Sequence, residues 1–172
     1  MNPALVDGVS VIAAGYTARE PQSAAIFFSS LWRLLQHRKV HNSVRIALRT
    51  IKPPKVQSRQ ALTEYLIFTC RVPLNMTLEN KVDHPRLWGP IVWRMLFYVS
   101  QLDQTPHFQE YWLKMMLSLP SVIPCDRCAQ HLKQHYRATE RQLLHCRNVR
   151  QCFQYLVNLK ERIANTQNNS AH

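Results

Sequence analysis

Two cysteines three positions apart carry the clearest chemistry in the sequence. Cys125 and Cys128 form a C-x-x-C directly after Pro124. Because proline suits the first turn of a helix, we expect a helix to begin here, with Cys125 at its N-terminus. The unpaired amides and the positive end of the helix dipole stabilise a thiolate there and lower its pKa. The pattern predicts a reactive dithiol, used either for redox chemistry or for metal binding; two inert core cysteines are the alternative.

The metal interpretation can be tested by helix geometry. His131 and His135 extend the pair to C-x2-C-x2-H-x3-H, which is superficially a zinc motif. At a rise of ~1.5 Å per residue, Cys125 and His135 would lie ~15 Å apart along one helix, whereas zinc holds its ligands at ~2.0 to 2.3 Å. The four side chains cannot converge, and a site would need two of them plus a more distant cysteine. We therefore predict no metal site and expect both histidines to face the surface or a partner.

The elements that position this pair should be helical. The chain has three glycines, and residues 125–172 contain neither glycine nor proline, so the tight hairpins of a β-protein would lack their turns. We predict an all-α protein. Apolar spacing and proline positions predict five helices after residue 80: from Pro85 to near Gln101, from Thr105 to before Pro120, from Pro124 to Tyr136, from Thr139 to Cys146, and one capped by Asn148. The buried face expected for this last helix is Val149, Cys152, Phe153, Leu156 and Ile163.

The first 79 residues form a basic extension. Residues 1–21 are expected to be a loose leader, and residues 23–51 one or two amphipathic helices that end before Pro53 and Pro54. The apolar side is Ile26, Phe27, Leu31, Leu34 and Leu35; the basic side is Arg33, Arg38, Lys39, Arg45 and Arg49. This arm could bind nucleic acid or an anionic membrane, with Trp32 stacking on a base, or it could pack its apolar side on the rest of the chain.

Composition limits the class of protein. The chain has 172 residues, 46% of them hydrophobic, which allows one domain, or one small domain plus an arm. No uncharged apolar run reaches the ~18 to 20 residues of a membrane-spanning helix, and the N-terminus lacks a secretory signal pattern. The formal net charge of +12 favours an acidic partner, nucleic acid or an anionic membrane.

Three sequence features together resemble the Erv/ALR family of FAD-linked sulfhydryl oxidases. They are the stretch 87–97 (LWGPIVWRMLF), the PCDRC of residues 124–128 about thirty residues later, and an aromatic final helix. The resemblance covers about residues 84–165 and implies a four- or five-helix bundle at 80–165, preceded by the extension 1–79 and followed by a polar tail at 166–172. It also implies thiol oxidation in which electrons pass through the C-x-x-C and FAD to oxygen.

The resemblance assigns roles to individual residues. Cys128 would face the flavin, while Cys125 would exchange with substrate dithiols. The residues expected to bind FAD are Trp88, Trp93, Phe97, His131, Tyr155 and Lys160. Plain core packing is the alternative for the aromatic residues, and a solvated helix side chain for Lys160.

The sequence also departs from the family pattern. Phe97 replaces the histidine of the W-x-x-L-H motif, and residues 160–164 (KERIA) replace H-N-x-V-N. Poxvirus-type members are similar in these respects, which implies a virion or host cytoplasm as the location; the mitochondrial intermembrane space is the alternative. The rival interpretation is a flavin-free scaffold or virion protein with the same fold, whose basic arm binds nucleic acid or membrane. A zinc-stabilised module is a third.

Three expectations concern the remaining cysteines and the partners. A turn near Arg147 would allow Cys146 and Cys152 to form a structural disulfide, which six residues of straight helix, spanning ~9 Å, could not. Family members commonly pair through their first helices, so we expect a homodimer. The chain lacks a second C-x-x-C, so a separate protein dithiol carrier is the expected substrate, with oxygen as the electron acceptor.

Overall fold

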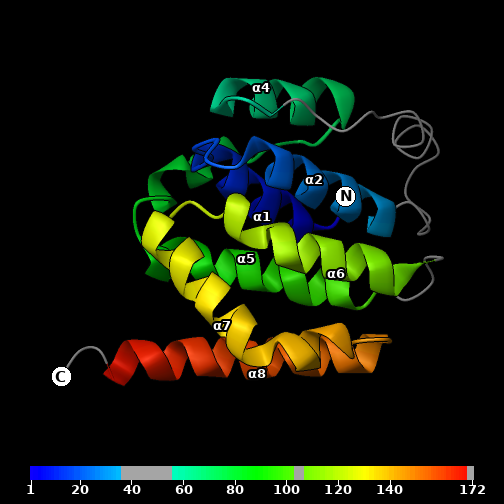
Figure 1. The fold of residues 1–172 in the computed structure, drawn as a ribbon. Helices are drawn as coiled ribbons and strands as arrows, with labels where there is room; N and C mark the ends of the chain where they lie inside the picture. Colours follow the sequence, from blue (N-terminus) through cyan, green and yellow to red (C-terminus); the bar gives the residue numbers. More distant parts are fainter. Residues whose placement is uncertain (36–55, 103–106, 170–172) are drawn as a thin grey trace.

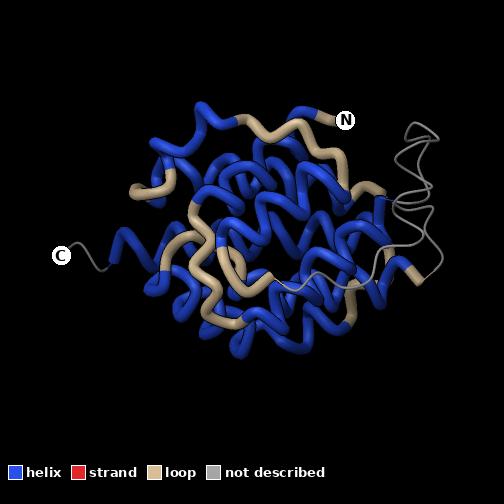
Figure 2. Tube along the Cα trace, turned by 90° about the horizontal axis from the view of Figure 1, so that it is seen from above, coloured by secondary structure: helices blue, strands red, loops and turns tan. Residues whose placement is uncertain are grey.

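The computed structural model describes residues 1–35, 56–102 and 107–169. These residues form helices and loops without a strand, which confirms the all-α prediction (Figure 2). The α-helices are α1 (Pro3–Ala14), α2 (Pro21–Leu35), α4 (Arg59–Glu64), α5 (Pro85–Ser100), α6 (Phe108–Ser118), α7 (Asp126–Leu144) and α8 (Val149–Asn169). A π-helical turn (Tyr65–Thr69) and two 3-10 segments (Met76–Lys81 and Leu119–Ser121) complete the fold.

The helices are stacked in layers. In Figure 1, α4 lies above α1 and α2, which rest on α5 and α6, while α8 lies below them. The most extensive packing joins α1 to α5 and α2 to α6. Helix α7 runs obliquely down one side and connects this stack to α8 (Figure 1). The C-x-x-C pair lies at the start of this oblique helix.

The first helix corrects the expectation of a loose leader. Helix α1 begins at Pro3 and is capped by Asn2, whose Oδ1 accepts a hydrogen bond of 2.9 Å from the amide of Ala4. A helix enclosed by other elements has no polar face, so its sequence shows no amphipathic period. The buried residues of α1 are Leu5, Gly8, Val9, Ser10, Val11, Ile12 and Ala13.

Helix α2 confirms part of the predicted amphipathic segment. Phe27, Leu31, Leu34 and Leu35 are buried, whereas Ile26 is 46% exposed and does not belong to the core. Trp32 is only 3% exposed, so it is not available to stack on a base, the role that the nucleic-acid interpretation offered for it. The predictions for 36–55, including Arg38, Lys39, Arg45, Arg49 and the Pro53-Pro54 break, lie outside the described residues.

The helices around the C-x-x-C follow the predicted periodicity. In α5, the buried set includes Trp88, Ile91, Val92, Met95, Leu96 and Val99, and in α6 it includes Phe108, Trp112, Met115 and Met116, as predicted. The start predicted for α6 at Thr105 and Pro106 lies outside the described residues. One hydrophobic cluster extends from Leu5 in α1 to Leu159 in α8, so residues of the N-terminal extension and of the region 80–165 share a core.

The break predicted between the third and fourth helices is confirmed as a kink: α7 runs from Asp126 to Leu144, and its backbone leaves helical geometry at Thr139, where the fourth helix was expected to begin. One prediction for the C-terminal region needs correction. Helix α8 continues through Asn169, so most of the predicted polar tail is helical. Its predicted cap is confirmed, because Asn148 Oδ1 accepts a hydrogen bond from the amide of Gln151 at 3.0 Å.

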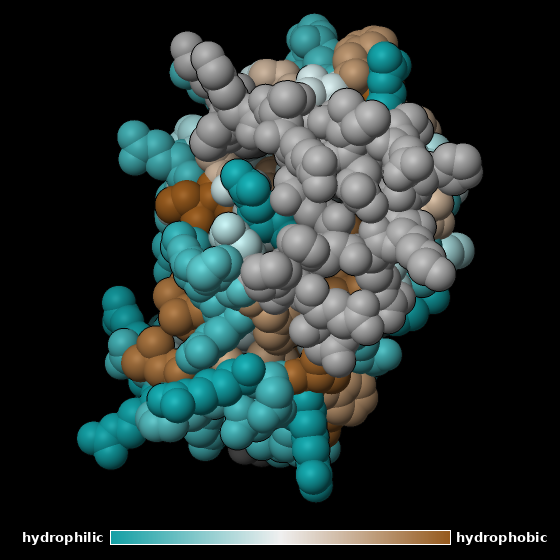
Figure 3. Space-filling model, turned by 90° about the vertical axis from the view of Figure 1, so that its right-hand side faces the viewer, coloured by the Kyte–Doolittle hydropathy of each residue, from teal (hydrophilic) through white to brown (hydrophobic). Residues whose placement is uncertain are grey.

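The described helices include no candidate for a membrane span. No helix within 1–35, 56–102 and 107–169 combines the length and the apolar character that crossing a bilayer requires. On the face shown in Figure 3, exposed hydrophobic residues occur in small groups separated by hydrophilic ones.

Candidate functional site

The two cysteines of the C-x-x-C form a disulfide at the start of α7. Their Cα atoms are 5.1 Å apart, and both side chains are half-buried. Cys125 is the N-cap residue: its Sγ accepts a hydrogen bond of 3.1 Å from the amide of Cys128, and its carbonyl accepts one of 2.9 Å from Ala129. The predicted position of the pair at a helix N-terminus is confirmed.

The segment before the disulfide is packed into the protein. Pro120, Val122 and Ile123 are buried, unlike the residues of most surface loops. Ser118 and Ser121 bond to backbone carbonyls at 2.6 Å, which satisfies polar groups where α6 gives way to the 3-10 segment. The C-x-x-C is therefore presented by a packed connection.

Three of the predicted FAD-binding residues come together between α5 and α8. The ring centroids of Trp93 and Phe97 are 6.2 Å apart, and Lys160 Nζ lies 5.9 Å from the Phe97 centroid. Phe153 joins them, with its ring centroid 5.1 Å from that of Phe97 and 40% of the residue exposed. The prediction that Phe153 belongs to the buried face of its helix is wrong. Its spacing of seven residues from Lys160, about two helical turns, was the available signal that both lie on one side of the helix.

The other three predicted FAD-binding residues lie in different surroundings. Trp88 is buried at the start of α5, and its indole Nε1 has no hydrogen-bond partner. Tyr155 is buried and bonds Thr139 Oγ1 at 3.0 Å, and burial raises the pKa of Tyr155 to about 12. Next to it, the hydroxyl of buried Tyr136 has no hydrogen-bond partner, and its pKa is raised by burial. His131 lies exposed on α7, one turn after Cys128.

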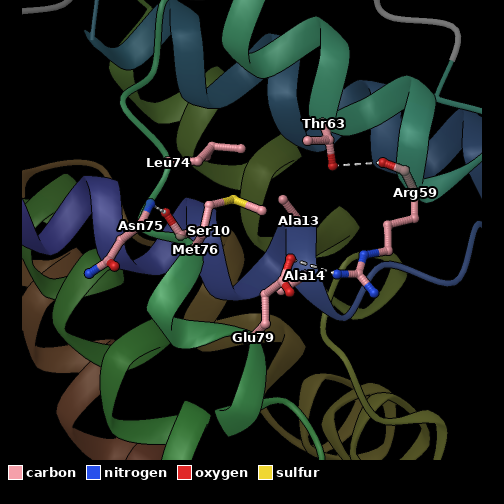
Figure 4. Close-up of a pocket in the computed structure, with 9 residues that line it drawn as sticks. All are labelled: Ser10, Ala13, Ala14, Arg59, Thr63, Leu74, Asn75, Met76 and Glu79. Atoms are coloured by element: carbon pink, nitrogen blue, oxygen red, sulfur yellow. Dashed lines mark hydrogen bonds and ion pairs between the residues drawn. The ribbon is translucent and has the colours of Figure 1, made fainter.

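The chemistry of these groups fits FAD in part. Half-exposed aromatic rings with a cation beside them suit a flat heteroaromatic ring and a phosphate. Buried polar atoms without partners, as in Trp88 and Tyr136, are uncommon in proteins and can mark where a ligand completes the bonding. The small pocket in Figure 4 is elsewhere: it is lined by residues of α1, α4 and the segment 74–79, and by no predicted site residue.

The histidines after the C-x-x-C do not assemble a metal centre. His135 is half-buried, and its Nε2 lies 3.3 Å from Thr166 Oγ1 on α8. Its pKa is lowered, first by burial and then by the charges of Arg162 and His131. Across the described ranges, no group of three or more His, Cys, Asp or Glu side chains could hold a metal ion.

The predicted disulfide between Cys146 and Cys152 is not formed in this structure. Both are buried free thiols. The Cys146 Sγ donates to the carbonyl of Gln142 at 3.2 Å, so the thiol is engaged by the end of α7. The closeness of the two thiols lowers the pKa of Cys146 and raises that of Cys152. The turn that brings the two residues together was predicted correctly, but the two sulfurs are not bonded to each other.

One residue near the disulfide was missed entirely by the sequence analysis. Arg19, in the connection between α1 and α2, pairs with Asp126, the residue that follows Cys125. The two are 107 positions apart in the sequence, and no local pattern signals such a contact.

Comparison of the chain with known protein families, with curated proteins and with solved structures finds no match.

Proposed function

We propose that this protein is a thiol oxidase that forms disulfide bonds in protein substrates through the Cys125–Cys128 pair. The observation that carries the proposal is the disulfide itself, at the N-terminus of a 19-residue helix and half-exposed. A helix N-terminus stabilises the thiolate released when such a disulfide is attacked, which favours exchange.

The exchange with substrate takes place in two steps. A substrate thiolate attacks Cys125 Sγ, a bond forms between the two sulfurs, and Cys128 leaves as a thiolate. The second substrate thiol, after losing its proton, attacks the substrate sulfur and displaces Cys125. The substrate has then lost two electrons and two protons to become a disulfide, and Cys125 and Cys128 are both reduced.

The finer part of the proposal is FAD. When bound, FAD accepts the electron pair of a dithiol and passes it to oxygen. Trp93, Phe97 and Phe153 would hold its rings, and Lys160 would lie near a phosphate, because these groups share one surface. The unpartnered indole Nε1 of Trp88 is a further donor available to the cofactor.

The remaining cysteines support a separate dithiol carrier as the immediate substrate. Cys70, Cys146 and Cys152 are 0%, 3% and 0% exposed, so none of them can collect electrons from a large substrate and relay them to Cys125. The net charge of +12 favours a carrier with an acidic surface, whose encounter would slow as salt is raised. A Cys128→Ser variant should trap this carrier on Cys125 as a mixed disulfide.

Location and oligomeric state complete the proposal. A virion or host cytoplasm, with the mitochondrial intermembrane space as the alternative, follows from the resemblance to poxvirus-type oxidases. The homodimer also remains a prediction, but α1 already covers one side of α5. A dimer would therefore need a different surface from that side of α5, and light scattering at micromolar concentration measures whether it forms.

The test is oxygen consumption by the full chain supplied with FAD and a dithiol. Cys125→Ser and Cys128→Ser should each abolish thiol-dependent consumption. Cys70→Ala is the matched control, since Cys70 is buried and belongs to no pair, and it should retain activity if it remains folded. Full activity in either C-x-x-C variant would refute the proposal, and a folded protein that never binds FAD would favour the flavin-free scaffold.

A further inference from the structure

The connection between α1 and α2, residues 15–20, lies against the C-x-x-C segment; we refer to it as the strap. Its central contact is Arg19, whose Nη1 pairs with the carboxylate of Asp126. Arg19 Nη2 donates to the carbonyl of Ile123 at 2.7 Å and reaches that of Pro120 at 3.4 Å. One guanidinium thus binds both the loop before the disulfide and the residue inside it.

Two more contacts fix the strap on either side of Arg19. Gly15 lies so close to Pro124 that a Cβ at Gly15 would be 2.3 Å from the Pro124 Cβ. The carboxylate of Glu20 accepts a hydrogen bond from Lys133 Nζ, and this contact is the main cause of the lowered pKa of Glu20. The strap therefore meets the C-x-x-C segment before, at and after the disulfide.

The Arg19 side chain is anchored more firmly than its partner. It is 23% exposed and fixed by backbone carbonyls, whereas the Asp126 side chain is 73% exposed. Reduction of the disulfide at neutral pH leaves negative charge on sulfur at the helix N-terminus. The Asp126 carboxylate, one residue away, opposes that charge, and the Arg19 guanidinium offsets it.

Other charges near α7 do not replace Arg19. Arg127 and His131 are exposed on the same helix as Asp126. The ammonium of Lys133 is already paired with Glu20 from the strap. Within the described ranges, Arg19 is the cation that forms an ion pair with Asp126.

We infer that Arg19 is a positioning residue that favours the reduced form of the Cys125–Cys128 pair, by neutralising Asp126 while holding the loop in place. A more stable dithiol makes the disulfide a stronger oxidant toward substrate thiols. The inference rests on the proposed function only in treating this pair as redox-active, and it requires neither flavin nor oxygen.

The experiment is the equilibrium of the purified full chain with glutathione in the absence of oxygen. Two glutathione thiols reduce the Cys125–Cys128 disulfide and become glutathione disulfide, so two electrons are exchanged and one S–S bond replaces another. Rapid alkylation and mass analysis of the peptide with residues 125 and 128 give the equilibrium constant for reduction. Circular dichroism confirms that each variant is folded.

Variants of the two partners should shift the equilibrium constant in opposite directions, and this separates a positioning role from a merely structural one. Arg19→Gln should lower the equilibrium constant for reduction by about two- to fivefold, the range of an exposed ion pair, and Asp126→Asn should raise it. Arg19→Lys keeps the charge and should shift it less than Arg19→Gln does. Arg59→Gln is the matched control, since Arg59 forms an exposed pair with Glu79 in other elements, and should leave the constant unchanged.

The outcomes distinguish this inference from the proposed function. If the wild-type pair exchanges with glutathione but Asp126→Asn does not raise the constant, or shifts it in the same direction as Arg19→Gln, the role of Arg19 is wrong and the proposed function is unaffected. Because the Asp126 side chain is exposed, Asp126→Asn should fold, and its equilibrium constant can be measured even if Arg19→Gln does not fold. A wild-type disulfide that no glutathione mixture reduces in the folded protein contradicts both.

Discussion

The five cysteines show how burial separates similar side chains into different roles. Cys125 and Cys128 are half-exposed and bonded to each other, while Cys70, Cys146 and Cys152 lie in the core as thiols. A thiol must be accessible and ionised to exchange, and burial opposes both. Of the five cysteines, the pair at the start of α7 is therefore the one placed to exchange with a thiol from outside the protein.

Cys70 should make stability depend on alkaline pH. Burial, partly offset by the neighbouring Tyr65, raises the pKa of the Cys70 thiol from 9.0 to about 11. Between these pH values the unfolded chain loses the thiol proton and the folded chain keeps it. The contribution of Cys70 to the free energy of unfolding is therefore fully present below pH 9 and is lost as the pH rises toward 11. This group contributes a slope of up to about 1.4 kcal/mol per pH unit.

Urea unfolding between pH 8.5 and 10.5 measures this slope. Other buried groups, such as Tyr155, also titrate in alkali, so the comparison is with Cys70→Ala, in which the decline should be shallower. Equal slopes in the two proteins would show that the Cys70 thiol ionises as readily in the folded protein as in the unfolded chain.

Single residues were predictable from the sequence where their signal is local. The C-x-x-C after proline correctly predicted its position at a helix N-terminus. Arg19 could not be found, because its contact with Asp126 depends on how α1 and α2 pack on the rest of the chain. Phe153 was predicted to be buried because an aromatic residue beside other apolar residues of a helix is usually in the core. Its exposure depends on the position of the neighbouring helix, which the sequence does not give.

Among the helices, amphipathic ones were predicted well and the enclosed one was missed. The apolar stripes of α5 and α6 identified their buried residues, since each helix has a polar side for contrast. Helix α1 has no such contrast, although Asn2 and Pro3 are a recognisable start signal. The helix break predicted at Thr139 is present as a kink in α7. The sequence could not show that Thr139 bonds to Tyr155 across the α7–α8 contact.

The close approach of α1 to α5 gives a matched pair of glycine variants. A Cβ at Gly8 would lie 2.5 Å from the Met95 Cβ, so Gly8→Ala should destabilise the protein by about 1 to 3 kcal/mol through overpacking. Gly89, within α5, has open space around it, and Gly89→Ala should be neutral or stabilise by up to about 1 kcal/mol. Urea unfolding of both variants checks the sign; destabilisation by Gly89→Ala alone would mean that the packing of α1 on α5 is wrong.

At the scale of the whole molecule, the N-terminal helices are part of the core. Leu5, Val9 and Ile12 of α1 are at most 2% exposed and belong to the same cluster as the buried residues of α5 to α8. This arrangement places the strap beside the disulfide. The resemblance covers only residues 84–165, so it gave no expectation of this packing.

Two isoleucines test the shared core. Ile12 is fully buried, so Ile12→Ala should lower the free energy of unfolding by about 2 to 5 kcal/mol, whereas Ile26, 46% exposed, should tolerate the same change within about 0.5 kcal/mol. Tryptophan fluorescence should report one cooperative transition that shifts in Ile12→Ala. Two separate transitions, with the one that reports on Trp88 and Trp93 unmoved, would indicate independent domains.

The most direct test of the thiol oxidase account is the visible spectrum of the full chain with FAD when a dithiol is added without oxygen. Bound oxidised flavin absorbs at ~450 nm and loses this absorption band on reduction. We predict rapid bleaching in the wild type and its loss in Cys128→Ser, with the band returning when oxygen is admitted to the wild type. A folded protein that binds no flavin, or a flavin that bleaches equally fast in Cys128→Ser, would contradict the account.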